Sequence, residues 1–110
     1  TATSVIYTLS LHDALPIFRG LFAQTLFLAT AAVDLRAGLT YPALSDIPVK
    51  RAMIEAAERV VLVADSSKIG RRSFTALGGI ELVDVLVTDA GVAAADRIAI
   101  EQAGVEVMVA

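Results

Sequence analysis

Residues Val60–Gly70 read VVLVADSSKIG, a run of five apolar residues followed by a polar turn. A short apolar run that ends at turn-forming residues is typical of a strand buried in a parallel sheet. In an open parallel sheet, ligands bind outside the carboxyl ends of the strands. The polar residues that follow Ala64 therefore stand where a ligand-binding loop is expected.

Apolar runs and helical patterns alternate on both sides of this stretch. The sequence predicts strands at Leu26–Ala31, Val60–Ala64, Val83–Thr88 and Val105–Val109. It predicts three helices: one capped by Ser45 or Asp46 with Pro48 in its first turn, a short one at Ser73–Leu77, and one at Ala93–Ala103. Loops are expected at Asp34–Leu44 and Asp65–Arg72. Strands and helices that alternate at this spacing indicate right-handed crossovers, so we expect an α/β fold with a parallel sheet.

Composition limits the classes of function. The chain has 110 residues, of which 56% are hydrophobic, and its net charge is -3. Without a block of basic residues it is a poor nucleic-acid binder by itself. It has no cysteine and one histidine, which excludes disulfides, thiolate catalysis and cysteine-based zinc sites. We expect no cofactor, no membrane partner because no apolar run reaches 18 residues, and a cytoplasmic location.

The first 17 residues, TATSVIYTLSLHDALPI, differ in style from the rest. They show no amphipathic period, and YTLSLHDALPI resembles the translation of a sequencing adapter. We therefore expect residues 1–17 to be non-native, with native sequence starting near Phe18 or Arg19. The alternative is a genuine strand and helix at the N-terminus.

The loop after the central strand carries the richest set of polar groups. Asp65 can accept hydrogen bonds from sugar hydroxyls, Ser66 and Ser67 can donate to an anion, and Lys68 supplies a positive charge. A solvated turn capped by Asp65 explains the same composition and is the commoner case. The turn after the next strand, at Asp89, has the same two interpretations, and there the plain turn is favoured.

Two further positions are candidates for ligand contact. Lys50 is expected in the first turn of its helix, where free N–H groups attract anions. It is otherwise a surface lysine. Asp34 precedes Gly38 and either contacts a polyol or starts a turn. No Ser–His–Asp set is present, and spacing does not select an acid–base pair from Asp65 with Lys68 or Asp34 with Lys50.

Five segments occur in an order that resembles a known family. They are Asp34–Thr40 (DLRAGLT), Val49–Met53 (VKRAM), Val60–Gly70, Val83–Asp89 (VDVLVTD) and Ala103–Val107 (AGVEV). Together they resemble the sugar-phosphate-sensing domain of DeoR/GlpR transcriptional repressors. The resemblance implies a parallel-sheet fragment of a ribose-5-phosphate isomerase/CoA-transferase-like sensor domain over residues 18–110.

The resemblance also implies a function. In such repressors the domain binds a phosphorylated sugar or related metabolite, which weakens operator binding by an N-terminal winged helix-turn-helix. Carried onto this chain, the ligand-binding residues are Asp34, Gly38, Lys50, Asp65, Ser66, Ser67 and Lys68. The winged helix-turn-helix and the first phosphate loop are missing from the pattern, so operator contact is expected only through that N-terminal domain. We expect a homo-oligomer at full length, with a sugar-phosphate isomerase-like enzyme fragment as the alternative.

Overall fold

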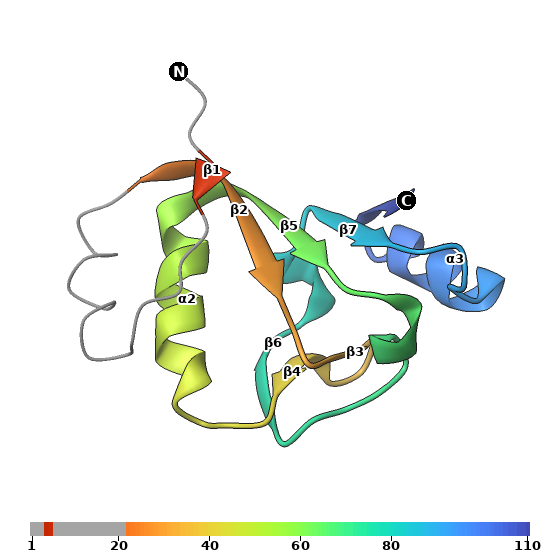
Figure 1. Ribbon diagram of the computed structural model, residues 1–110, viewed down its shortest axis with the longest axis horizontal. Helices are drawn as coiled ribbons and strands as arrows, with labels where there is room; N and C mark the ends of the chain where they lie inside the picture. Colours follow the sequence, from red (N-terminus) through yellow and green to blue (C-terminus); the bar gives the residue numbers. More distant parts are fainter. Residues whose placement is uncertain (1–3, 6–21) are drawn as a thin grey trace.

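The computed structural model describes residues 4–5 and 22–110, which form two sheets and two α-helices (Figure 1). The larger sheet contains β1 (Ser4–Val5), β2 (Ala23–Ala29), β5 (Ala57–Val63), β7 (Val85–Thr88) and β8 (Glu106–Val109). The smaller sheet contains β3 (Ala32–Asp34), β4 (Gly38–Tyr41) and β6 (Thr75–Gly78). The helices are α2 (Asp46–Ala56) and α3 (Ala94–Gln102), and two short 3-10 turns are η1 (Ser66–Lys68) and η2 (Ile80–Leu82). The predicted boundary at residue 17 lies outside the described residues.

The larger sheet confirms the predicted parallel α/β fold. Its strand order is β1-β2-β5-β7-β8, and every neighbouring pair is parallel. One row across four strands consists of Leu28, Leu62, Leu86 and Val107, all buried. The side chains of this row point to the face of the sheet that packs against the core, whereas Phe27 and Val63, which point to the opposite face, are partly exposed.

The smaller sheet corrects two predictions. The segment Asp34–Leu44, expected as a loop, contains an antiparallel hairpin in which β3 pairs with β4. The segment Ser73–Leu77, expected as a short helix, supplies β6, which pairs with β4 from the other side. Strand pairing over about 35 residues of separation overrides the local preference of such a short segment, because strand propensity depends on packing partners.

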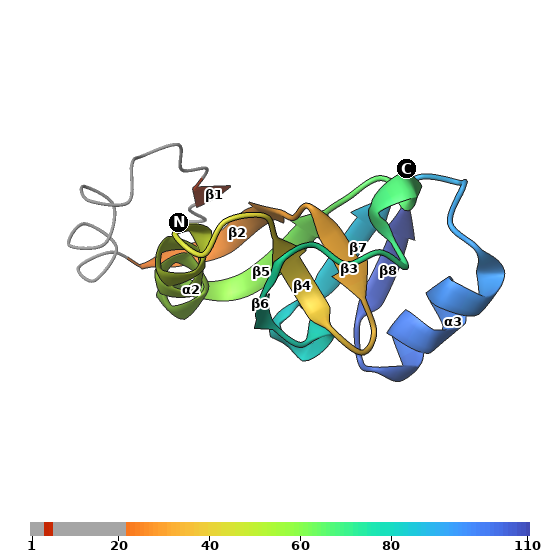
Figure 2. The ribbon, with the colours of Figure 1, turned by 90° about the horizontal axis from the view of Figure 1, so that it is seen from below.

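The core lies between one face of the larger sheet and the elements that pack on it, which are α2, α3 and the smaller sheet. A single apolar cluster joins Leu62 of the sheet with Met53 of α2, Leu39 of β4, Leu77 of β6 and Ile100 of α3. Figure 2 shows the smaller sheet lying across the larger one, with α2 and α3 at its two sides. No helix in the described part of the chain is long and apolar enough to span a membrane.

The two helices confirm two expectations and correct one. Helix α2 begins at Asp46 with Pro48 in its first turn, and Gly104 follows α3 with a φ of 95° that ends the helix. Lys50 is the fifth residue of α2, so it lies in the second turn and not in the first. The free N–H groups of the helix start are therefore one turn away from the position of Lys50.

Candidate functional site

The candidate site lies where the parallel strands end. Thr30 follows β2, Asp65 stands two residues after β5, and Asp89 follows β7. Because neighbouring parallel strands end at the same edge of a sheet, these residues share one edge. Two shallow hollows open along it.

The loop after β5 is tightly folded. Asp65 precedes η1, and its Oδ1 accepts a hydrogen bond from the Ser67 amide at 2.9 Å and another from the Ser67 hydroxyl. These bonds lower the pKa of the Asp65 carboxyl, so it stays ionised. Lys68 Nζ lies 4.0 Å from Asp65 Oδ2, and both side chains are about half exposed. Such a solvent-exposed pair is weak, so the ammonium can exchange partners.

The turn after β7 holds this loop from the neighbouring strand. Asp89 Oδ2 accepts a hydrogen bond from the Ser66 amide at 2.9 Å, and Asp89 Oδ1 accepts one from the Gly91 amide at 2.8 Å. The backbone amide and side chain of Ser66 lower the pKa of the Asp89 carboxyl. The loops after β5 and β7 therefore form one hydrogen-bonded unit.

The first hollow, of about 230 Å³, lies at the end of β2. Its lining comprises Ala29, Thr30, Ala31, Tyr41, Asp46 and Lys50. Lys50 Nζ lies 5.7 Å from the centroid of the Tyr41 ring, within range of a cation–π interaction. Tyr41 donates a hydrogen bond from its hydroxyl to the Ala29 carbonyl at 2.6 Å, and burial raises its pKa to about 12. Lys50 therefore lies at the carboxyl edge, where its ammonium packs over the ring of Tyr41.

The second hollow, also of about 230 Å³, lies at the ends of β5, β7 and β8. Its lining comprises Val63, Ala64, Asp65, Val87, Thr88, Asp89 and Ala110. The Thr88 side chain is 4% exposed, and its hydroxyl has no hydrogen-bond partner among the described residues. Two carboxylates therefore border a hollow whose walls are otherwise largely apolar.

Asp34 is engaged elsewhere. Its Oδ1 accepts hydrogen bonds from the amides of Arg36 at 2.6 Å and Ala37 at 3.3 Å, and its Oδ2 accepts one from Arg72 Nε at 2.6 Å. The Arg72 guanidinium and these amides lower the pKa of Asp34 to about 2. The geometry therefore gives Asp34 a role in closing the β3–β4 turn.

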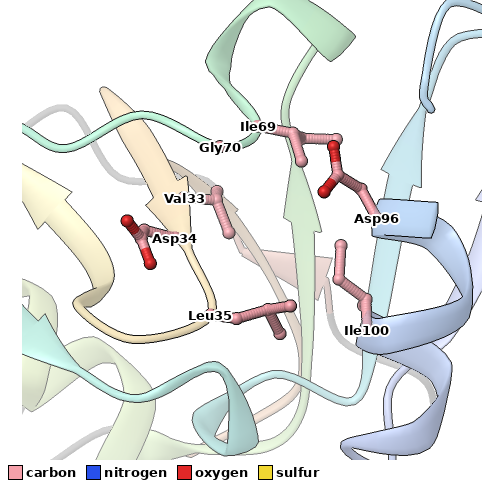
Figure 3. A pocket seen from close by; sticks show the side chains of 7 residues that line it. All are labelled: Val33, Asp34, Leu35, Ile69, Gly70, Asp96 and Ile100. Carbon is pink, nitrogen blue, oxygen red and sulfur yellow. The ribbon is translucent and has the colours of Figure 1, made fainter.

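A third hollow, of about 150 Å³, is lined by residues from β3, α3 and the segment after η1, and Asp34 and Gly70 are among them. Val33, Leu35 and Ile100 surround it, while the Asp34 side chain points away (Figure 3). Asp96 and Ile69 complete one wall. This hollow lies between the β3–β4 hairpin, α3 and the residues that directly follow η1.

Gly38 has a φ of 81°, a conformation that suits glycine. A Cβ at this position would overlap the Gly78 carbonyl of β6. The close backbone approach that Gly38 permits is thus made to the neighbouring strand. Of the seven predicted ligand residues, the structure brings Lys50 and Asp65–Lys68 to one edge and places Asp34 and Gly38 in the hairpin.

Three residues at the candidate site were not selected from the sequence, namely Asp89, Thr88 and Tyr41. Asp89 follows an apolar strand just as Asp65 does, and this shared pattern is the signal that could have selected it. Tyr41 and Thr88 carried no signal of this kind, because their placement depends on the hairpin and on strand register.

Comparison with known proteins agrees with this architecture. The family described as "DeoR C terminal sensor domain" matches residues 8–90, and the chain belongs to that family. The match includes part of the segment predicted to be non-native, and that boundary stays a prediction.

Several curated relatives are named as regulators. The chain is 47% identical over 83 residues to the HTH-type transcriptional regulator GlpR of Haloferax volcanii, covering 76% of this chain and 32% of the relative. It is 35% identical over 83 residues to a putative aga operon transcriptional repressor of Escherichia coli O157:H7, covering 76% and 31%. It is 44% identical over 45 residues to the glycerol-3-phosphate regulon repressor of Escherichia coli K12, covering 41% and 18%. The chain thus spans about a third of the length of its first two relatives, both of which are named as transcriptional regulators or repressors.

Proposed function

We propose that this chain is the effector-sensing part of a DeoR/GlpR-type repressor and binds a phosphorylated sugar or related metabolite at the carboxyl edge of its parallel sheet. The observation that carries the proposal is the convergence of Lys50, from α2, with Asp65–Lys68, from the loop after β5, on the ends of neighbouring strands. The two groups are far apart in sequence, and the fold places them at the ends of neighbouring strands, Lys50 beside the hollow at the end of β2 and Asp65 beside the hollow at the end of β5.

The chemistry of this edge suits a polyol that carries a phosphate. Lys50 and Lys68 each have an ammonium that attracts a phosphate, and neither is locked in a strong ion pair with another described residue. Asp65 stays ionised, and its Oδ2 can accept hydrogen bonds from hydroxyls. The Ser67 hydroxyl already donates to Asp65 Oδ1, so towards a ligand it can act as an acceptor, while the Ser66 hydroxyl can donate. Asp34 and Gly38 act in this proposal by holding the hairpin beside the site.

The names of the relatives suggest suitable probes. One is a glycerol-3-phosphate regulon repressor, so glycerol 3-phosphate is the first compound to test. In the full-length protein, effector binding would modulate operator binding by an N-terminal winged helix-turn-helix. That protein would act in the cytoplasm as a homo-oligomer, with DNA contacted only through the N-terminal domain.

Isothermal titration calorimetry tests the proposal. We expect glycerol 3-phosphate to bind and glycerol to bind more weakly, because only the former offers a dianion to the two ammonium groups. Lys50→Gln and Lys68→Gln should each lower affinity by about tenfold, the usual loss for one charged hydrogen bond.

Arg59→Gln is the matched control, since it removes one positive charge from β5 near the amino end of the strand. It should leave affinity within about twofold of the parent, because an exposed charge at the opposite edge is screened. Equal losses in all three variants would indicate a nonspecific charge effect and contradict the proposed site.

A further inference from the structure

Two aspartates flank β7 and bind β5 and its loop in the same manner. Asp84 precedes the strand, and its Oδ2 accepts a hydrogen bond from the Val60 amide at 2.7 Å. Asp89 follows the strand, and its Oδ2 accepts one from the Ser66 amide at 2.9 Å. One aspartate thus fixes the entry to the buried part of β5, and the other fixes the exit into the candidate effector loop.

The Asp89 bond completes the loop's hydrogen bonding. The Ser67 amide donates to Asp65 Oδ1, the Lys68 amide donates to the Asp65 carbonyl at 3.1 Å, and the Ile69 amide donates to the Ser66 carbonyl at 3.2 Å. With the Ser66 amide donating to Asp89, each backbone N–H from Ser66 to Ile69 has an acceptor inside the protein. A ligand at this loop must therefore be contacted by side chains and not by a cradle of free amides.

Close packing supports the same arrangement. A Cβ on Gly91 would lie 2.6 Å from Ser66 Oγ and 2.9 Å from Asp89 Oδ1. A larger residue at position 91 would have to displace the Ser66 and Asp89 side chains. The Gly91 amide also binds Asp89 Oδ1 at 2.8 Å, which holds the carboxylate in place.

We infer that Asp89 is a positioning residue for the effector site: it orients the backbone of the turn Ser66–Lys68, from which the serine hydroxyls and the lysine side chain project. The inference rests on the proposed function only for the identity of the site. Holding binding groups in place before the ligand arrives lowers the entropy cost of binding, so losing Asp89 should weaken binding without removing any contacting group.

Residue-resolved amide hydrogen exchange by NMR tests this role without a ligand. In Asp89→Asn the amide group can accept one hydrogen bond but cannot replace both carboxylate oxygens. We expect exchange at the Ser66 amide to rise at least about tenfold, the effect of losing one charged hydrogen bond. Exchange in the middle of β5 and β7 should stay unchanged.

Asp84→Asn is the matched control, because it removes the equivalent carboxylate at the other end of β7. It should accelerate exchange at Val60 and leave Ser66 unaffected. Unchanged exchange at Ser66 in folded Asp89→Asn, or acceleration of equal size throughout the chain, would overturn the inference. If Asp89→Asn does not fold, Gly91→Ala supplies the test, because its Cβ would meet Ser66 Oγ and Asp89 Oδ1. These side chains must then shift, and exchange at the Ser66 amide should rise.

A binding measurement with glycerol 3-phosphate separates this inference from the proposed function. If Asp89→Asn binds more weakly and its exchange rises at Ser66 but not elsewhere, the result supports both the inference and the proposed function. If the parent chain binds no glycerol 3-phosphate while exchange at Ser66 still rises, the loop is positioned by Asp89 and the choice of effector is wrong. Parent-like affinity in Asp89→Asn would show that positioning has no effect on binding and would contradict the inference.

Discussion

Arg72 Nε lies 2.6 Å from Asp34 Oδ2 and ties the segment after the candidate effector loop to the β3–β4 hairpin. The same two segments also meet where Val33 bridges Ile69 and where the Gly70 amide donates to the Val33 carbonyl at 2.7 Å. The loop is therefore fixed by Asp89 on one side and by the hairpin on the other.

The Asp34–Arg72 pair should make stability depend on pH in the acid range. The pKa of the Asp34 carboxyl is about 2 in the folded chain, compared with 3.8 for an unperturbed aspartate. The folded state therefore binds the carboxyl proton less readily than the unfolded state does. The pair therefore stabilises the fold fully above pH 4, and this contribution disappears as the pH falls from about 4 to 2. Urea unfolding at a series of pH values measures it.

Arg72→Gln is the variant to compare, because it keeps a side chain of similar length without the charge. The fall in unfolding free energy between pH 4 and 2 should become shallower, since the amides of Arg36 and Ala37 still bind Asp34. An identical slope in both proteins would show that the ion pair does not set the pKa of Asp34.

Gly38 and Gly70 form a natural pair for testing backbone crowding. Both have positive φ, 81° and 83°, but a Cβ on Gly38 meets the Gly78 carbonyl whereas one on Gly70 meets open space. Gly70→Ala should cost about 1 kcal/mol, the strain of a positive φ. Gly38→Ala should cost clearly more, because β4 and β6 must also separate. Equal losses in denaturant midpoint would contradict the close approach seen here.

Leu62 and Val63 test which face of β5 is packed. Leu62 is fully buried in the middle of the sheet, whereas the neighbouring Val63 is 47% exposed. Leu62→Ala should lower the free energy of unfolding by roughly 2–5 kcal/mol, because it leaves a cavity in the core. Val63→Ala should cost less than about 1 kcal/mol. Chemical denaturation measures both losses of unfolding free energy. Losses of similar size would contradict the burial of Leu62 in the core and the exposure of Val63.

Tyr41 should titrate late. Burial raises its pKa to about 12, and its neutral form donates to the Ala29 carbonyl, so the folded state holds this proton more tightly than the unfolded state. Stability from Tyr41 is therefore complete below pH 10 and is lost as the pH rises towards 12. Replacing Tyr7 by Phe leaves Tyr41 as the one tyrosine, and ultraviolet absorbance then follows its ionisation. A midpoint at pH 10 with the fold intact would contradict the burial of its hydroxyl.

The sequence predicted those parts of the fold that depend on local apolar runs. β5, β7 and β8 are short valine-rich segments between turn-forming residues, and the structure places them as neighbours in one parallel sheet. The smaller sheet escaped prediction because its strands have three or four residues each, and β6 is defined by pairing with a distant β4. Local sequence carries little information on such pairings.

The candidate site divides in the same way. Asp65–Lys68 could be selected because a polar turn at the end of a buried strand is visible in the sequence. The position of Lys50 on the same edge depends on how α2 packs beside Tyr41, and the sequence placed it one turn too early in the helix. Asp34 and Gly38 were selected as ligand residues because a turn and a binding loop use the same residue types.

In the proposed function, the carboxyl edge of the parallel sheet binds a phosphorylated polyol. Backbone amide chemical shifts, recorded by NMR during a titration with glycerol 3-phosphate, test it most directly. We predict saturable shifts concentrated at Thr30, Lys50, Ser66–Lys68 and Asp89, with little change near Arg59 at the opposite edge. Saturable shifts centred on the amino ends of the strands, or no saturable shift with any phosphorylated polyol, would contradict the claim.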